Sequence, residues 1–169
     1  LTTGLANVVI GFAALDAADA GESFNVAIGN TAMGAVDEGS NNSDDNVAIG
    51  SDALLGGTGQ VQHNVVIGAS AMNSTGSNAQ TGTVAIGSSA LTALTSGASN
   101  TAVGYTAGAA ITTGERNTIL GYEALDGGST EVDDNTAIGF RAMTGAIGTE
   151  AVNDCVAIGS YALYGALEE

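Results

Sequence analysis

Few side chains in this sequence could carry catalysis. His63 is the single histidine and Cys155 is the single cysteine. Acid–base and nucleophilic catalysis need a nucleophile, a base and an orienting group held together, and no serine or cysteine stands near His63 at the spacing of a catalytic motif. A lone cysteine cannot form an intrachain disulfide. We therefore predict that the protein is not an enzyme and has no catalytic residue and no cofactor.

Acidic pairs are the candidates for metal binding. Asp44-Asp45 and Asp133-Asp134 each stand directly before an asparagine. Clusters of carboxylate oxygens can hold Ca²⁺, but these pairs lack the ligand spacing of an established calcium loop. We favour solvated acidic loops without a metal site, and bound Ca²⁺ stays as the alternative interpretation.

Aromatic side chains recur at similar places along the chain. Phe12, Tyr105, Tyr122, Phe140 and Tyr161 each follow closely after one of a series of glycines. Such rings could stack on sugars, or they could pack against the same position of neighbouring repeats. We favour packing between repeats.

Composition and charge exclude several classes of protein. The 169 residues include 2 basic and 18 acidic side chains, which gives a formal net charge of −16. Binding to nucleic acid phosphates or to an anionic membrane surface needs lysine and arginine, so both are excluded. The absence of proline rules out a collagen helix. No apolar run approaches the length of a membrane-spanning helix, so we predict no membrane insertion.

One motif repeats along the whole chain. It reads N-x-[AVI]-[IVL]-G-x-x-A and occurs nine times, at intervals of 17 to 21 residues. Residues that tolerate tight corners bracket each copy. Thr83 and Cys155 stand where the other copies have asparagine. The predicted structural corners are Asn7, Asn25, Asn46, Asn64, Asn100, Asn117 and Asn135, together with Gly11, Gly29, Gly50, Gly68, Gly87, Gly104, Gly121, Gly139 and Gly159.

The three residues before each glycine predict a short strand that is apolar on both faces. One face carries bulky residues such as Ile28, and the other carries mostly alanine, such as Ala27. We expect the bulky face to fill the coil and the alanine face to line contacts between chains, with asparagines hydrogen-bonded along the stack. Variable stretches such as Asp37 to Asp45 and Gly56 to His63 are predicted surface loops. The fold prediction is an all-β solenoid of about nine coils, a single repeat domain over 1–169 within a longer fibre-like chain.

The motif resembles the head repeats of trimeric autotransporter adhesins. Asn100-Thr-Ala-Val-Gly-Tyr-Thr-Ala is more similar to the related arrays of phage and other viral tail fibres. The resemblance covers essentially the whole chain, although the units here are longer than the compact family repeat. It implies a left-handed parallel β-roll, three identical chains packed side by side, and a left-handed conformation at the asparagine corners.

These observations lead to two functional hypotheses. The first is a structural and adhesive segment of a trimeric extracellular fibre, a viral tail fibre or spike taking part in host attachment. The second is the head region of a bacterial cell-surface adhesin that binds glycan or matrix through its loops. Both predict a homotrimer with a host receptor or glycan as partner and a location on a virion or cell surface. Left-handed helix acyltransferases would need aliphatic residues six and twelve after Ile28, where Gly34 and Ser40 stand instead.

Overall fold

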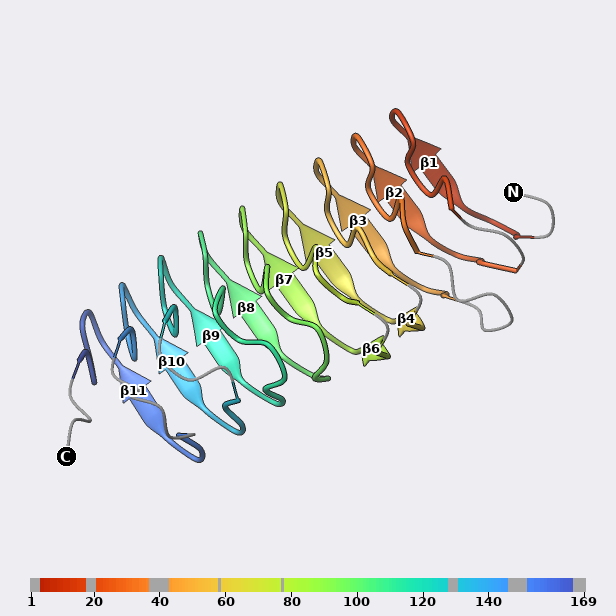
Figure 1. Cartoon of the computed structure of the whole chain (residues 1–169). Coiled ribbons are helices and arrows are strands. Elements are labelled where there is room, and N and C mark those ends of the chain that lie inside the picture. Colours follow the sequence, from red (N-terminus) through yellow and green to blue (C-terminus); the bar gives the residue numbers. More distant parts are fainter. Residues whose placement is uncertain are drawn as a thin grey trace.

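The chain is a parallel β-solenoid (Figure 1). The computed structural model describes residues 4–17, 21–36, 43–57, 59–76, 78–127, 131–145 and 152–165. Residues 37–42 of the predicted loop Asp37 to Asp45, and residue 58 of the predicted loop Gly56 to His63, lie outside these ranges. Each coil contributes one short strand to a sheet that runs along the stack, with the first and the last strand at opposite ends (Figure 1).

The principal sheet has nine parallel strands in the order in which the coils follow along the chain. They are β1 (Val8–Ile10), β2 (Val26–Ile28), β3 (Val47–Ile49), β5 (Val65–Ile67), β7 (Val84–Ile86), β8 (Thr101–Val103), β9 (Thr118–Leu120), β10 (Thr136–Ile138) and β11 (Val156–Ile158). A second sheet pairs β4 (Val61–Gln62) with β6 (Gln80–Thr81). The prediction of an all-β solenoid is confirmed. No helix long and apolar enough to cross a membrane occurs in the described ranges.

Neighbouring coils stack in register. Val26 of β2 pairs with Val47 of β3, and Ile28 pairs with Ile49, so equivalent residues of successive motifs lie directly over one another. Backbone hydrogen bonds join the coils beyond the strands as well: the Gly50 amide donates to the Ile28 carbonyl at 2.8 Å. Any side chain repeated in the motif therefore forms a row along the stack.

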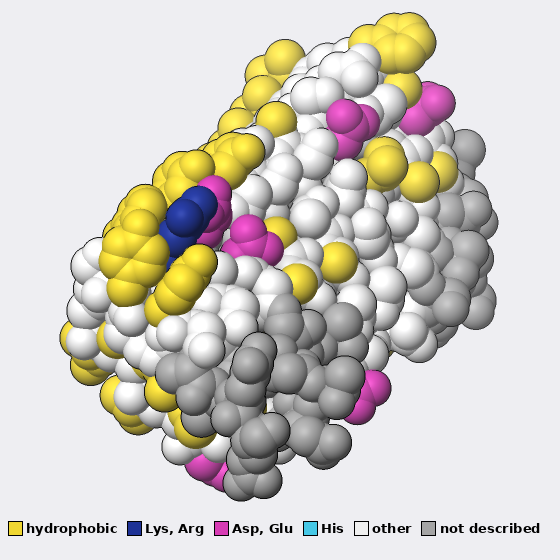
Figure 2. All heavy atoms as spheres, turned by 60° about the vertical axis from the view of Figure 1, so that its left-hand side comes forward, with side chains coloured by type: hydrophobic (Ala, Val, Ile, Leu, Met, Phe, Trp, Pro, Cys, Tyr) yellow, Lys and Arg dark blue, Asp and Glu magenta, His cyan; other side chains and the backbone are white. Residues whose placement is uncertain are grey.

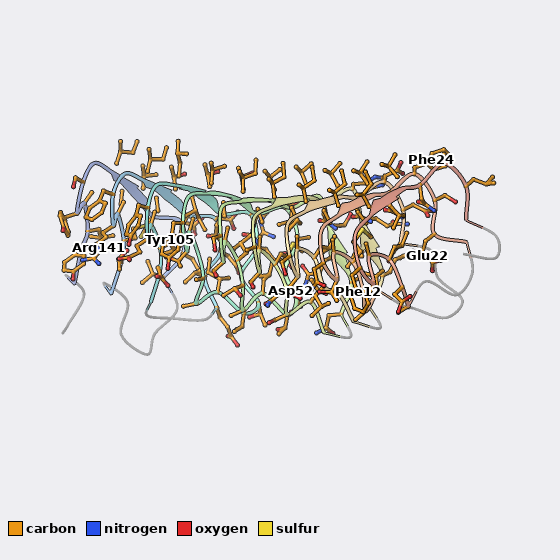
Figure 3. The ribbon with its side chains drawn as sticks, turned by 90° about the horizontal axis from the view of Figure 1, so that it is seen from above. Phe12, Glu22, Phe24, Asp52, Tyr105 and Arg141 are labelled. Carbon is orange, nitrogen blue, oxygen red and sulfur yellow. The ribbon has the colours of Figure 1, made fainter. Side chains whose placement is uncertain are left out.

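The two faces of the sheet are the reverse of the sequence prediction. The middle residue of each strand, such as Ala27, Ala48 or Ala85, is completely buried inside the coil. The first and third residues, which form the outer face of the sheet, point away from the coil and stand in a row along one side of the ribbon (Figure 3). The expectation that alanine would line contacts between chains was wrong. The reason is that large side chains from the wall after the glycine corner already fill the lumen: Met33, Leu54, Met72, Leu91, Leu125 and Met143 are all fully or almost fully buried.

One coil shows how tightly the lumen is filled. Gly108 takes the place where other coils have leucine or methionine, and Ile119 in the next strand takes the place where most have alanine. A Cβ atom added to Gly108 would come within 2.8 Å of both Ile119 Cδ1 and Leu91 Cδ2. The large residue on one wall therefore compensates for the missing side chain on the other.

The left-handed backbone conformation lies one residue before each asparagine. Phe24, Asp45 and Asp134 have φ angles of 61°, 60° and 59°, whereas none of the seven corner asparagines has a positive φ. The prediction of left-handed asparagines was wrong. Each asparagine already leads into the strand and directs its own amide toward the neighbouring coil, so the chain reverses at the preceding residue.

The compensation between Gly108 and Ile119 is testable by a double-mutant cycle. Ile119→Ala alone should cost about 2–5 kcal/mol of stability, because it leaves a cavity. Gly108→Leu alone should cost about 1–3 kcal/mol through overpacking. The double variant should lose clearly less than the sum of the two in chemical denaturation, because leucine at 108 fills the space that Ile119 leaves. Additive losses would contradict the inward placement of Ile119.

Candidate functional site

A ladder of asparagine side chains runs inside the solenoid. The Asn46 side-chain amide donates to Asn25 Oδ1 at 3.0 Å, and the Asn64 amide donates to Asn46 Oδ1 at 3.1 Å. The same Asn25 oxygen also accepts the Asn46 backbone N–H at 2.9 Å. The amide group of Asn46 reaches in addition the carbonyl of Val61 across the coil at 2.8 Å. The predicted hydrogen bonding along the stack is confirmed.

The asparagine ladder is interrupted once and ends once. Thr83 donates its backbone N–H to Asn64 Oδ1 at 2.9 Å, but its buried hydroxyl has no hydrogen-bond partner. The ladder resumes where Asn117 donates to Asn100 Oδ1 at 2.9 Å. At the C-terminal end of the ladder, Cys155 donates its backbone N–H to Asn135 Oδ1 at 3.0 Å. Its side chain is a free thiol that packs against the core. The two departures from asparagine thus divide and end the ladder.

The first aspartate of each acidic pair joins neighbouring coils. Asp44 Oδ1 accepts the Ser23 N–H at 2.7 Å, and Asp133 Oδ1 accepts the Glu115 N–H at 2.8 Å. Both carboxylates thus satisfy backbone donors at the same corner of the coil. Among the described residues, no three or more histidine, cysteine or acidic side chains gather as a metal site.

The second aspartate of each pair lies beside a basic side chain. The Arg116 guanidinium donates to both carboxylate oxygens of Asp134, at 2.8 and 2.9 Å, and this hydrogen bonding lowers the pKa of Asp134. Asp45 Oδ2 lies 3.6 Å from His63 Nδ1, and both side chains are exposed. His63 is therefore placed at a surface corner next to a carboxylate.

Five aromatic rings form a continuous row, here called the aromatic row, across the last four coils. The ring centroids of Tyr105 and Tyr122 are 5.2 Å apart and those of Tyr122 and Phe140 are 5.4 Å apart, both pairs stacked. Tyr161 meets Phe140 edge-on at 5.2 Å, and Tyr164 meets Tyr161 in the same way. The predicted packing between coils is confirmed for these rings. Phe12 lies toward the other end of the stack from Tyr105 (Figure 3) and is 80% exposed.

An ion pair borders the aromatic row. Arg141 Nε donates to Glu123 Oε2 at 2.5 Å, and the guanidinium carbon lies 5.4 Å from the centre of the Phe140 ring. The Tyr122 hydroxyl is also hydrogen-bonded to Glu123, and this bond raises the pKa of Tyr122 above its ordinary value. Hydrophobic side chains surround a basic side chain with an acidic neighbour near the end of the molecule that comes forward in Figure 2. Sequence reasoning missed this pair, although the separation of 18 residues, one coil, was a usable signal.

The chain matches no protein-family model, no curated protein and no solved structure. Asparagines, acidic pairs and aromatic rings form hydrogen bonds, ion pairs and stacked rows along the coils, whereas the buried Glu22 carboxylate has no hydrogen-bond partner among the described residues.

The interruption of the asparagine ladder predicts a stabilising substitution. Thr83→Asn should supply an oxygen for the Asn100 N–H and an amide for Asn64 Oδ1, and it removes the unpaired hydroxyl. We expect a gain of about 1 kcal/mol or more in the free energy of unfolding, because each net hydrogen bond contributes about that much. Thr81→Asn, two residues away and exposed, is the matched control and should change stability by less than about 0.5 kcal/mol. A neutral or destabilising Thr83→Asn would contradict a continuous ladder as a source of stability.

The Glu123 hydrogen bond predicts a late tyrosine ionisation. Tyr122 should ionise above the ordinary tyrosine pKa near 10, because its neutral hydroxyl donates to the Glu123 carboxylate. Because the pKa of Tyr122 is raised in the folded protein, the bond stabilises the fold below about pH 10, and this contribution is lost as the pH rises through the raised pKa. In an absorbance titration of tyrosinate, Glu123→Gln should lower the highest transition, and Glu115→Gln should leave it unchanged. Equal effects of the two variants would show that the bond does not govern Tyr122.

Proposed function

We propose that the chain is a structural and adhesive segment of a trimeric extracellular fibre, of the kind that forms viral tail fibres and spikes and takes part in host attachment. In this role it is a stiff spacer and a display surface, not a catalyst. The observation that carries the proposal is the outer face of the sheet, a flat aliphatic wall with no covering element among the described residues.

The outer face is wholly aliphatic in four successive strands of the sheet. In β2, β3, β5 and β7 its residues are valine at the first position and isoleucine at the third. They are only partly buried by one another. Full burial of such a side chain contributes about 1.5–3 kcal/mol, so covering this wall with two identical walls would stabilise a trimer strongly. The resemblance of the motif to trimeric head repeats supports three as the number of copies.

The outer face is more polar in β8, β9 and β10, whereas β11 again has valine at the first position and isoleucine at the third. Thr101, Thr118 and Thr136 replace valine at the first position of β8, β9 and β10. The aromatic row begins in this same part of the chain. We infer a division of labour in which the N-terminal coils supply most of the association energy and the C-terminal coils display side chains to partners.

The proposal predicts that charges on the outer face dissociate the assembly. Ile67→Asp combined with Ile86→Asp should convert a trimer into monomers that keep their β circular-dichroism signal, because carboxylates cannot be buried unpaired. The matched control is Ala69→Asp with Ser88→Asp, exposed positions two residues further along the same coils, which should stay trimeric. Mass from light scattering and sedimentation velocity distinguishes the states.

Salt conditions complete the experiment. Each chain carries a formal charge of −16, so repulsion opposes assembly at low ionic strength. The wild-type trimer should be more stable near physiological salt, where the Debye length is about 8 Å, than at about 0.01 M. A wild-type protein that stays monomeric and folded at both salt concentrations would overturn the proposed trimer.

A further inference from the structure

The aromatic row has unusual exposure for packed rings. Tyr105, Tyr122, Tyr161 and Tyr164 remain 44–50% exposed although each contacts a neighbouring ring. These four are all the tyrosines of the chain. Tyr105, Tyr122 and Phe140 stand directly after the corner glycine. At that position the β2, β3, β5 and β7 coils hold Asn30, Ser51, Ala69 and Ser88. This position is therefore small in four successive coils and aromatic in the three coils of β8, β9 and β10.

The stacking geometry leaves part of each ring face uncovered. Two rings in full face-to-face contact would be separated by about 3.5–4.0 Å, whereas the stacked centroids here are 5.2 and 5.4 Å apart. Tyr105, Tyr122 and Phe140 are therefore displaced sideways and overlap only in part, in the offset arrangement that aromatic pairs prefer. The row presents partial ring faces at a repeat of one coil.

Hydrogen-bonding groups are fixed along the same row. Arg141 and Glu123 hold one another beside Phe140, and the Tyr122 hydroxyl is bonded to Glu123. Apolar ring faces combined with a few oriented polar groups are typical of binding sites for amphipathic ligands. The C–H faces of a sugar ring are attracted to the negative face of an aromatic ring, and its hydroxyls can bond to carboxylate, guanidinium and phenol groups.

The negative charge of the chain favours an uncharged ligand over an anionic one. Nucleic acids and sulfated glycans also stack or hydrogen-bond on such surfaces, but their anionic groups would meet a chain with a formal charge of −16. Only one cation, Arg141, borders the row in the contacts of the described residues, and Glu123 neutralises it. An uncharged ligand avoids this repulsion.

We propose that the aromatic row, Tyr105, Tyr122, Phe140, Tyr161 and Tyr164 with Arg141 and Glu123, is a binding platform for a neutral, extended oligosaccharide lying along the stack of coils. It deepens the display role proposed above and assigns that role to one wall of the C-terminal coils. The successive rings would contact successive sugars, and the ion pair would receive hydroxyl groups.

Intrinsic fluorescence provides a direct assay. Because the chain has no tryptophan and all its tyrosines are in the row, tyrosine emission reports on this site alone. Cellohexaose, chitohexaose and maltohexaose are titrated separately into the wild-type protein, and saturation-transfer NMR identifies the sugar protons in contact with the rings. At least one probe should bind saturably, with its C–H protons receiving saturation. Tyr105→Ala with Tyr122→Ala should weaken that binding by at least about tenfold, equivalent to about 1.4 kcal/mol.

Controls separate binding from folding and from assembly. Phe12→Ala removes an exposed ring outside the row and should leave binding unchanged. Since the alanine variants lose stacking between coils, Glu123→Gln is a second, milder variant that should weaken binding while the circular-dichroism signal stays native. Oligomeric state is measured in the same samples: a monomer that binds the probe supports the platform and contradicts the trimer, and a trimer that binds none of the three contradicts the platform. Binding of heparin in place of the neutral probes would also overturn the proposal.

Discussion

The structure depends on how closely one coil can lie on the next. At the corner glycines the backbone of one coil rests against the carbonyl of its neighbour: a Cβ atom on Gly104 would lie 2.1 Å from the Gly121 oxygen, and one on Gly29 would lie 2.3 Å from the Gly50 oxygen. These glycines also have φ angles of +129° to +145°, which side chains rarely allow. The column of glycines therefore sets the close coil spacing, about 4.8 Å for hydrogen-bonded strands. Every repeated side chain inherits that spacing.

The spacing gives each row a distinct physical role. Asparagines at this repeat satisfy one another and the backbone inside the coil, and aspartates at the neighbouring corner accept amides from the preceding coil. Rings at this repeat must overlap or meet edge-on. Aliphatic side chains on the outer face cover one another only in part, which leaves them available for a second surface. The same repeat distance thus produces different contacts on different walls of the coil.

The sequence was informative where residue type alone determines a role. Periodic Gly and Asn predicted the coils and the ladder, because glycine suits the positive φ at the corner and an asparagine amide can both donate and accept along the stack. The sequence was misleading about which face of the strand points into the coil. Ala27 and Ile28 point to opposite faces, and because both are apolar, their alternation does not show which of the two is buried in the coil. That answer depends on Met33 and its equivalents, which fill the lumen from the opposite wall. The left-handed position was displaced by one residue, to Phe24 before Asn25, because the hydrogen bonds of the asparagine fix its own backbone. The ion pair between Glu123 and Arg141 could be predicted only with the register between neighbouring coils, and this register is hard to read from the sequence because the loops vary in length.

We propose that identical chains cover the outer face of the sheet in the assembled fibre. Methyl NMR of isoleucine-labelled protein with a soluble paramagnetic agent tests it most directly. Ile28, Ile49, Ile67 and Ile86 lie on the outer face, whereas Ile111 and Ile119 are buried inside the coil. We expect the outer-face methyl groups to relax nearly as slowly as those of Ile111 and Ile119. Strong paramagnetic broadening of the outer-face methyl groups in native protein would contradict it.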